Sequence, residues 1–146
     1  MNQIIQTKVI VRHNQKYLFL KKVKDIHSDH IGGWEVPGGK VELEGLPKEA
    51  AIREVKEETG LDCQLIKELK KLELEKDGIK TKTYVYLAEL INKISNKSKD
   101  SKNNVNVKLS DEHSKFVWAT YREVDKLENV IYKEHLKRYL MECEKI

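Results

Sequence analysis

The chain has 146 residues, with 28 Lys or Arg against 24 Asp or Glu and a formal net charge of +4. This length fits one domain, residues 1–146, with a single core. No apolar run is long enough to cross a bilayer and the first residues lack a signal-peptide layout, so a cytoplasmic protein is expected. Cys63 and Cys143 are far apart and form no CxxC pair, which argues against a disulfide framework.

The modest basic charge favours solubility and attraction for polyphosphate. A basic surface can also attract nucleic acid, but no recognisable RNA- or DNA-binding motif accompanies it, so nucleic acid is not expected as a partner. The sequence leaves the oligomeric state open, including a homodimer.

The first part of the chain predicts a β-hairpin. Residues 7–12 and 17–21 are rich in β-formers and flank the turn-like residues 13–16. Residues 22–30 predict a polar loop at the edge of a substrate cleft. A metal site among its Asp and His residues is the less favoured alternative, because the spacing of a zinc motif is missing.

Residues 34–37 predict a short strand that enters the pair Gly38-Gly39. Two glycines allow close backbone approach and unusual dihedral angles, so a peptide carbonyl in this loop is free to act as a ligand. Trp34 can stack on a nucleotide base, although a large aromatic side chain beside a tight turn more often serves packing.

A helix is predicted over residues 47–59. Pro47 suits the first helical position and Gly60 suits the left-handed residue that ends a helix. At 3.6 residues per turn, the apolar side chains gather on one side and the acidic ones on the neighbouring side. The apolar side contains Ala51, Ile52 and Val55, and the acidic side contains Glu54, Glu57 and Glu58.

The acidic side predicts a metal site. Carboxylate oxygens are hard ligands that suit Mg²⁺ or Mn²⁺, and the preceding glycine loop can add a carbonyl oxygen. Such a site would serve a phosphate-bearing substrate. The alternative is a solvated acidic helix face, which is the commoner role of a charge run.

The rest of the chain alternates between strands and helices. Asp77-Gly78 is a strong turn signal before a clear strand over residues 81–88. Lys, Ser and Asn dominate residues 92–104, which predicts a loop. The remaining expectations are an extended segment at 63–66, strands at 105–109 and 116–119, a helical turn at 122–127, and a helix at 131–143 with Leu136, Tyr139 and Leu140 facing inward.

Residues 39–61 resemble the Nudix box, which consists of a glycine loop and a helix that carries Arg-Glu, then Glu-Glu, then Gly and an apolar residue. The stretch from Arg53 to Leu61 matches that pattern without a gap, and Gly39 lies at the expected distance before it. One position departs from the pattern. The family usually has Gly-Glu where this chain has Glu44-Gly45, so the glutamate that helps to hold the loop and the arginine falls one position early.

The resemblance implies an α/β fold, the Nudix-type α/β/α sandwich with a mixed central sheet. It also implies a metal centre for Mg²⁺ or Mn²⁺ and a nucleotide substrate. The implied ligands are the Gly39 carbonyl and the carboxylates of Glu54, Glu57, Glu58 and Glu112, with Asp111 as the reserve for Glu112.

The resemblance assigns roles within this site. Arg53 would orient the glutamates; the alternative is a surface ion pair. Glu57 would hold the metal or take a proton from water, with Glu112 as the competing base. Glu54 is expected to serve both the metal and catalysis. Substrate contacts are expected from Trp34, Gly38 and Lys40.

The implied reaction is metal-dependent hydrolysis of a nucleoside diphosphate linked to another group. A nucleoside triphosphate pyrophosphohydrolase is the first choice. ADP-ribose is less favoured, because the proline that often marks that subgroup is missing beyond Leu61. RNA 5′ ends are a further option. The alternative from another class is a Nudix-fold sensor that binds nucleotides without catalysis, which would be expected to have lost these carboxylates.

Overall fold

The computed structural model describes residues 3–23, 31–91 and 105–146, which fold around one eight-stranded sheet. The path through the sheet is β3-β2-β1-β7-β5, while β4 pairs with β1, β6 with β7 and β8 with β2. The strands are β1 (Gln3–His13), β2 (Lys16–Lys22), β3 (Trp34–Glu35), β4 (Gly38–Lys40), β5 (Cys63–Glu68), β6 (Leu72–Lys76), β7 (Ile79–Leu90) and β8 (His113–Ala119).

The centre of the sheet is a long parallel pair. β1 and β7 run side by side from Gln3↔Lys80 to Arg12↔Glu89, whereas the other pairs are antiparallel, so the sheet is mixed as expected. In β1, the run Val9-Ile10-Val11 is fully buried, because both faces of the sheet are covered at this point.

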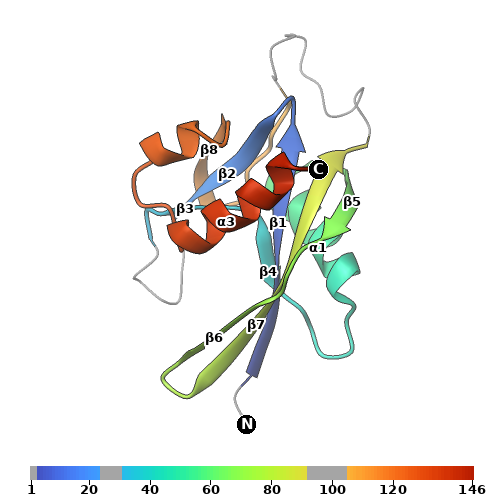
Figure 1. Cartoon of the computed structure of the whole chain (residues 1–146). Helices are drawn as coiled ribbons and strands as arrows, with labels where there is room; N and C mark the ends of the chain where they lie inside the picture. Colours follow the sequence, from blue (N-terminus) through green and yellow to red (C-terminus); the bar gives the residue numbers. More distant parts are fainter. Residues whose placement is uncertain (1–2, 24–30, 92–104) are drawn as a thin grey trace.

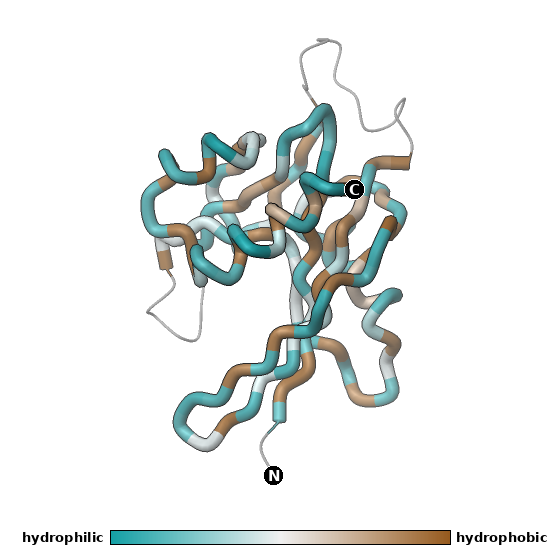
Figure 2. Tube along the Cα trace, in the orientation of Figure 1, coloured by the Kyte–Doolittle hydropathy of each residue, from teal (hydrophilic) through white to brown (hydrophobic). Residues whose placement is uncertain are grey.

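Two helices cover the sheet from opposite sides (Figure 1). Ala51 and Val55 of α1 (Pro47–Thr59) pack into one apolar cluster with Val9 and Val11. The other face carries α3 (Lys133–Glu144), whose Leu136 and Leu140 join a second cluster with Ile10 and Phe19. Brown apolar residues accordingly alternate with teal polar residues along the tube in Figure 2. The predicted α/β/α sandwich is confirmed.

The two strands of the first hairpin diverge away from their turn. β1 and β2 pair only beside their turn, at Arg12↔Tyr17 and His13↔Lys16. Farther along, β3 pairs with β2 and β4 pairs with β1, so the chain between β3 and β4 fills the gap. The Val9 N–H donates to the Pro37 carbonyl at 2.8 Å. The glycine loop is therefore held inside the sheet.

Local sequence signals predicted most elements. The helix begins at Pro47 and ends at Thr59, and Gly60 has φ +73° with its N–H on the Lys56 carbonyl. The first hairpin is confirmed, and the turn signal at Asp77-Gly78, which suggested a second hairpin, joins β6 to β7. The helical turn is confirmed as a 3-10 helix at Glu123–Lys126, and so is the C-terminal helix. Ile52 is 41% exposed rather than packed, so its assignment to the buried side was wrong.

The predicted strand at 105–109 was also wrong. This segment belongs to no strand, and the Lys108 N–H donates to the Thr59 carbonyl at 2.9 Å. Its backbone thus binds the end of α1. β4 was not predicted. The expected loop at 92–104 and most of the loop at 22–30 lie outside the described residues.

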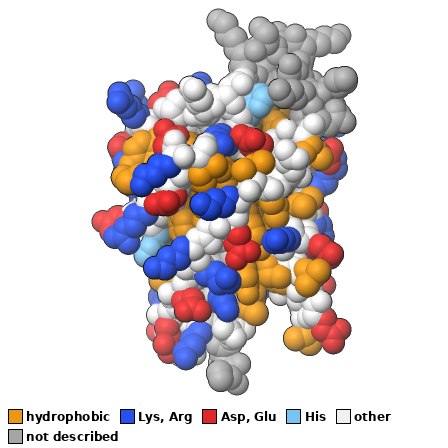
Figure 3. Space-filling view, turned by 45° about the vertical axis from the view of Figure 1, so that its right-hand side comes forward, with side chains coloured by type: hydrophobic (Ala, Val, Ile, Leu, Met, Phe, Trp, Pro, Cys, Tyr) orange, Lys and Arg blue, Asp and Glu red, His pale blue; other side chains and the backbone are white. Residues whose placement is uncertain are grey.

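Within the described residues, neither helix is long and apolar enough to cross a membrane. On the face shown in Figure 3, Lys and Arg side chains lie among Asp, Glu and apolar side chains and do not gather in one basic patch.

Candidate active site

The glycine loop lies directly over α1. At Gly39, a Cβ atom would come within 2.6 Å of the Glu54 carboxyl carbon and of one of its oxygens. At Gly38, a Cβ atom would come within 2.1 Å of the Thr7 carbonyl oxygen on β1. Glycine is therefore required twice, once to admit a carboxylate and once to admit a neighbouring strand.

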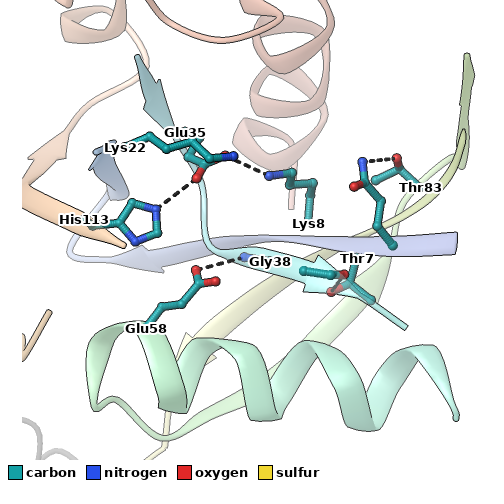
Figure 4. Close-up of polar contacts among 10 residues, drawn as sticks. Thr7, Lys8, Lys22, Glu35, Gly38, Glu58, Thr83 and His113 are labelled. Carbon is teal, nitrogen blue, oxygen red and sulfur yellow. Dashed lines mark hydrogen bonds and ion pairs between the residues drawn. The ribbon is translucent and has the colours of Figure 1, made fainter. Parts of the chain in front are cut away.

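Glu58, one helical turn after Glu54, also lies under the glycine loop. One of its carboxylate oxygens accepts a hydrogen bond from the Gly38 N–H at 3.2 Å (Figure 4). The residue is only 5% exposed. Burial raises the pKa of Glu58 to about 9; Lys8 and the Gly38 N–H oppose the rise, and Glu54 adds to it. This carboxyl holds a proton at neutral pH unless a cation approaches it.

Arg53 connects two of the helix glutamates. Its guanidinium lies 3.3 Å from a Glu54 oxygen and 3.5 Å from a Glu57 oxygen. Glu57 itself is 58% exposed. The contacts are those expected of a residue that orients the glutamates, and the role remains a prediction.

Glu112 precedes β8 on a turn tied to the end of α1. The Ser110 N–H donates to the Glu58 carbonyl at 3.4 Å, and the Glu112 N–H is 3.4 Å from the Ser110 hydroxyl oxygen. The side chains of Glu112 and Asp111 are exposed. The fold thus brings the Glu112 segment beside α1, while its part in the chemistry stays a prediction.

A second polar cluster was missed by sequence reasoning. Glu35, on β3, places one carboxylate oxygen 3.0 Å from the Lys8 ammonium and 3.6 Å from that of Lys22, and the other 2.9 Å from His113 Nε2. These side chains come from β1, β2, β3 and β8 and meet beside the glycine loop (Figure 4). The available signal was a glutamate between Trp34 and Val36 in a predicted strand.

Two expected substrate contacts lie on the surface around this loop. Trp34 packs partly into the second apolar cluster, and the Lys21 ammonium lies 5.8 Å from its ring centroid. These contacts favour the packing interpretation of Trp34 over base stacking. Lys40 is exposed at the end of β4. No described contact assigns either residue to a substrate.

The departure at 44–45 leaves the loop backbone intact. The Gly45 N–H donates to the Glu42 carbonyl at 2.8 Å and closes a turn in which Glu44 has φ +69°. Glu44 thus occupies the left-handed position that favours glycine, and Gly45 supplies no side chain to support Arg53. Arg53 contacts Glu54 and Glu57 instead.

The donors beneath the loop fit a hard divalent cation. The Glu54 carboxylate against Gly39 and the buried Glu58 carboxyl offer oxygen ligands of the kind that Mg²⁺ and Mn²⁺ prefer. Over residues 3–23, 31–91 and 105–146, however, no three Asp, Glu, His or Cys side chains meet closely enough to hold a metal ion. The structure joins Glu54 and Glu58 to the loop but does not gather Glu57 and Glu112 with them.

Two relatives of this chain carry the name 8-oxo-dGTP diphosphatase, one of them as putative. The putative 8-oxo-dGTP diphosphatase YtkD of Bacillus subtilis is 34% identical in an alignment of 114 residues that covers 64% of this chain and 68% of that protein. The 8-oxo-dGTP diphosphatase of Proteus vulgaris is 40% identical in an alignment of 59 residues that covers 38% of this chain. This chain spans 49% of the length of that Proteus relative.

Solved structures extend the likeness to the whole fold. A MutT protein from Methanosarcina mazei superimposes with a TM-score of 0.74 at 22% identity, over 99% of this chain and 94% of that one. An ADP-ribose pyrophosphatase from Streptococcus suis gives 0.66 at 17% identity, over 96% and 88%. Because proteins with different named substrates share the fold, it does not identify a substrate. The family model described as NUDIX domain matches residues 5–140, and the chain therefore belongs to the Nudix hydrolase family.

Proposed function

We propose that the protein hydrolyses nucleoside triphosphates to a nucleoside monophosphate and pyrophosphate, with Mg²⁺ or Mn²⁺ as cofactor. The observation that carries this proposal is the approach of the Glu54 carboxylate to Gly39, which leaves no room for a side chain at residue 39. Family membership supports hydrolysis, and the buried Glu58 carboxyl supports the need for a cation.

The side chains of the candidate site have different proposed roles. Glu54, Glu58 and the Gly39 carbonyl would hold the cofactor, which would neutralise phosphate charge and polarise the phosphorus under attack. Arg53 keeps the carboxylates of Glu54 and Glu57 in place through its two ion pairs. Glu57 is exposed enough to meet water and accept its proton, and Glu112 is the competing base.

The named relatives point to a substrate class. Three curated relatives, from Proteus vulgaris, Bacillus subtilis and Escherichia coli, carry the name 8-oxo-dGTP diphosphatase, the second as putative. We therefore expect an oxidised purine deoxynucleoside triphosphate to be the best substrate among common nucleotides.

The test measures products from 8-oxo-dGTP, dGTP, the other common triphosphates and ADP-ribose, with Mg²⁺, with Mn²⁺ and with chelator. Glu54→Gln should lower kcat at least about 100-fold, since it removes a charged ligand beside the reacting phosphates. Glu49→Gln, an exposed position in the first turn of the same helix, is the matched control and should keep full activity. Turnover that survives chelation, or full activity of Glu54→Gln, would contradict the proposal.

A further inference from the structure

The α3 side of the sheet is open at the end next to Gly39. The apolar cluster beneath α3 contains Ile10 of β1 and Val85 of β7, but no earlier residue of either strand, both of which the structure describes in full. The first residues of β1 continue past α3 together with β6 and β7 as a three-stranded extension (Figure 1). A face of the sheet is therefore left without a helix over it beside the glycine loop.

One row of side chains crosses this open face. Gln6 on β1 is the cross-strand partner of Lys40 on β4 and of Thr83 on β7. Thr83 in turn pairs with Leu72 on β6. Directly opposite residues of neighbouring strands point to the same side of a sheet, so these four side chains share one face.

The row lies one residue from the candidate metal site. Thr7 pairs with Gly39, and its hydroxyl is 3.4 Å from the Gly39 carbonyl oxygen. A side chain at Gly39 would meet Glu54 of α1, so Thr7 and Gly39 face α1, whereas Gln6 and Lys40 face away from it. A nucleotide held by both Gly39 and the exposed Lys40 would lie along β4 with Gln6 beside it.

The Gln6 amide is fixed at one end and open at the other. Its Nε2 donates to the Thr83 hydroxyl oxygen at 2.9 Å, the contact drawn at Thr83 in Figure 4, and Thr83 is only 3% exposed. Within the described residues, the carbonyl oxygen of the same amide makes no hydrogen bond and is not enclosed by protein. Gln6 thus presents an accessible acceptor whose direction is set by a buried neighbour.

An accessible acceptor selects a donor on the ligand. Phosphate oxygens at neutral pH are acceptors, so the matching group on a nucleotide is an N–H of the base or an O–H of the sugar. The next row on the same face favours the base. Ile4 pairs with Thr81 and Thr81 with Leu74, all of them part-exposed, so a mainly apolar surface adjoins the single amide. Apolar surface with a few fixed polar groups is typical of a site for a flat organic ring.

We propose that Gln6 contacts the base of the substrate, with its carbonyl oxygen accepting a hydrogen bond from a base N–H group. The proposal rests on the proposed function for the class of substrate. Thr83 acts as the positioning residue, because its hydroxyl fixes the direction of the amide. The open face of β1, β6 and β7 supports the ring, and Gln6 helps to decide which bases the site accepts.

Two substitutions at residue 6 test the acceptor. Gln6→Leu removes it, so KM for 8-oxo-dGTP should rise about 10-fold with kcat little changed, as expected for one lost hydrogen bond to bound substrate. Gln6→Glu keeps an oxygen acceptor and can accept from the Thr83 hydroxyl, so its KM should stay within about 3-fold of the wild type. Unchanged KM in Gln6→Leu, or the same rise in Gln6→Glu, would overturn the proposal.

The matched control is Gln3→Leu. Gln3 lies on the same strand, is exposed and points to the opposite face, because it is an odd number of residues from Gln6. The same exchange there should leave KM and kcat unchanged. A rise in KM equal to that of Gln6→Leu would assign the effect to the strand as a whole and overturn the contact.

The positioning role of Thr83 requires a double-variant comparison. Thr83→Val removes the hydroxyl with little change of shape, and KM should rise about 3-fold because the Gln6 amide loses its fixed direction. In the Gln6→Leu background the same exchange should add nothing to KM, since no amide is left to orient. Penalties that simply add would overturn this role of Thr83.

Binding of a base-free analogue separates the base from the sugar and the phosphate. Calorimetry with Mg²⁺ would give the Kd of 8-oxo-dGMP and of 2-deoxyribose 5-phosphate for the wild type and for Gln6→Leu. The Kd of 8-oxo-dGMP should rise about 10-fold in the variant, whereas that of 2-deoxyribose 5-phosphate should not change. An equal loss for both ligands would place the contact on the sugar or the phosphate and overturn the proposal.

The same titration keeps this proposal separate from the proposed function. If the wild type hydrolyses no triphosphate but Gln6→Leu weakens 8-oxo-dGMP alone, the proposed function fails and the base contact stands. If triphosphates are hydrolysed with the same KM by the wild type and by Gln6→Leu, the proposed function stands and the contact fails. A wild type that does not bind 8-oxo-dGMP would also overturn the contact.

Discussion

Two buried glutamates lie on either side of the glycine loop, and their environments are opposite. Glu35 is 8% exposed and Glu58 is 5% exposed. Burial pushes the pKa of both upward, but Lys8, His113 and Lys22 hold the pKa of Glu35 below its ordinary range. The pKa of Glu58 rises to about 9, since burial outweighs the opposing effects of Lys8 and of the Gly38 N–H, and Glu54 adds to the rise.

The difference shows how the chain separates structure from chemistry. The charge of Glu35 is balanced by side chains of the same domain, so this carboxylate serves as a fixed cross-link among four strands. For Glu58, Lys8 and the Gly38 N–H do not offset the cost of burying the charge, so a proton or a cation from outside has to do so. A group of that kind is typical of a functional site, whereas the first kind stabilises the fold around it.

The largest expected effect comes from breaking the balanced cluster. Glu35→Leu would leave Lys8 and Lys22 facing an apolar side chain, and we expect a loss of about 3 kcal/mol in the free energy of unfolding, measured with urea. The lysines are 29% and 22% exposed, which keeps the loss at the low end for a buried pair.

The control is Glu89→Leu. Glu89 pairs with Arg12 at 3.1 Å in the same sheet; Glu89 is 42% exposed, whereas Arg12 is 15% exposed and also donates to the Cys143 carbonyl at 2.8 Å. Because water reaches Glu89 and Arg12 keeps that second partner, the loss should be about 1 kcal/mol. Equal losses in the two variants would show that the cluster around Glu35 is no better balanced than a surface ion pair.

The contributions of Glu58 and Glu35 to the free energy of unfolding should depend on pH in opposite directions. The pKa of Glu58 is about 9 in the folded state against an ordinary 4.5. Between these two pH values the folded state holds a proton that the unfolded state lacks. The stabilisation from Glu58 is therefore complete below about pH 4.5 and is lost as the pH rises through about 9. Glu35 has a lowered pKa, so its contribution is present above about pH 4.5 and is lost on acidification.

For metal-free protein, we expect the free energy of unfolding to fall by about 1 kcal/mol per pH unit between pH 6 and 8. Glu58→Gln should flatten this slope, because the amide mimics the protonated carboxyl at every pH. Mg²⁺ or Mn²⁺ should flatten it in the wild type as well, by taking the place of the proton. A slope that is the same in Glu58→Gln would assign the pH dependence to other groups.

The sequence predicted those parts of the site that depend on local signals. Pro47 and Gly60 correctly predicted the two ends of α1, because helix ends are set by neighbouring residues. The Glu54 and Gly39 pairing follows from the motif spacing. The sequence placed Glu58 with Glu54 and Glu57 on one acidic side. It did not predict the hydrogen bond from the Gly38 N–H of β4, which lies over Glu58.

Contacts across long separations could not be predicted. Glu35 and His113 are 78 residues apart and meet because β3 and β8 both pair with β2. The strand predicted at residues 105–109 was wrong although its local pattern is present in the structure. Val105 is buried, and Val107 and Leu109 pack against the same apolar cluster, so the alternation is real although no strand forms there.

The smallest effect concerns the inverted pair at 44–45. Glu44 has φ +69°, a conformation that costs a residue with a Cβ about 1 kcal/mol, while Gly45 lies outside this region. Glu44→Gly removes that strain but makes the unfolded chain more flexible, so we expect a net gain of about 0.5 kcal/mol, read from urea unfolding. Leu43→Gly, one position earlier and 96% exposed, adds only flexibility and should lose stability. If both variants lost stability equally, the turn would tolerate Glu44 without strain, and the inversion would bear only on the support of Arg53.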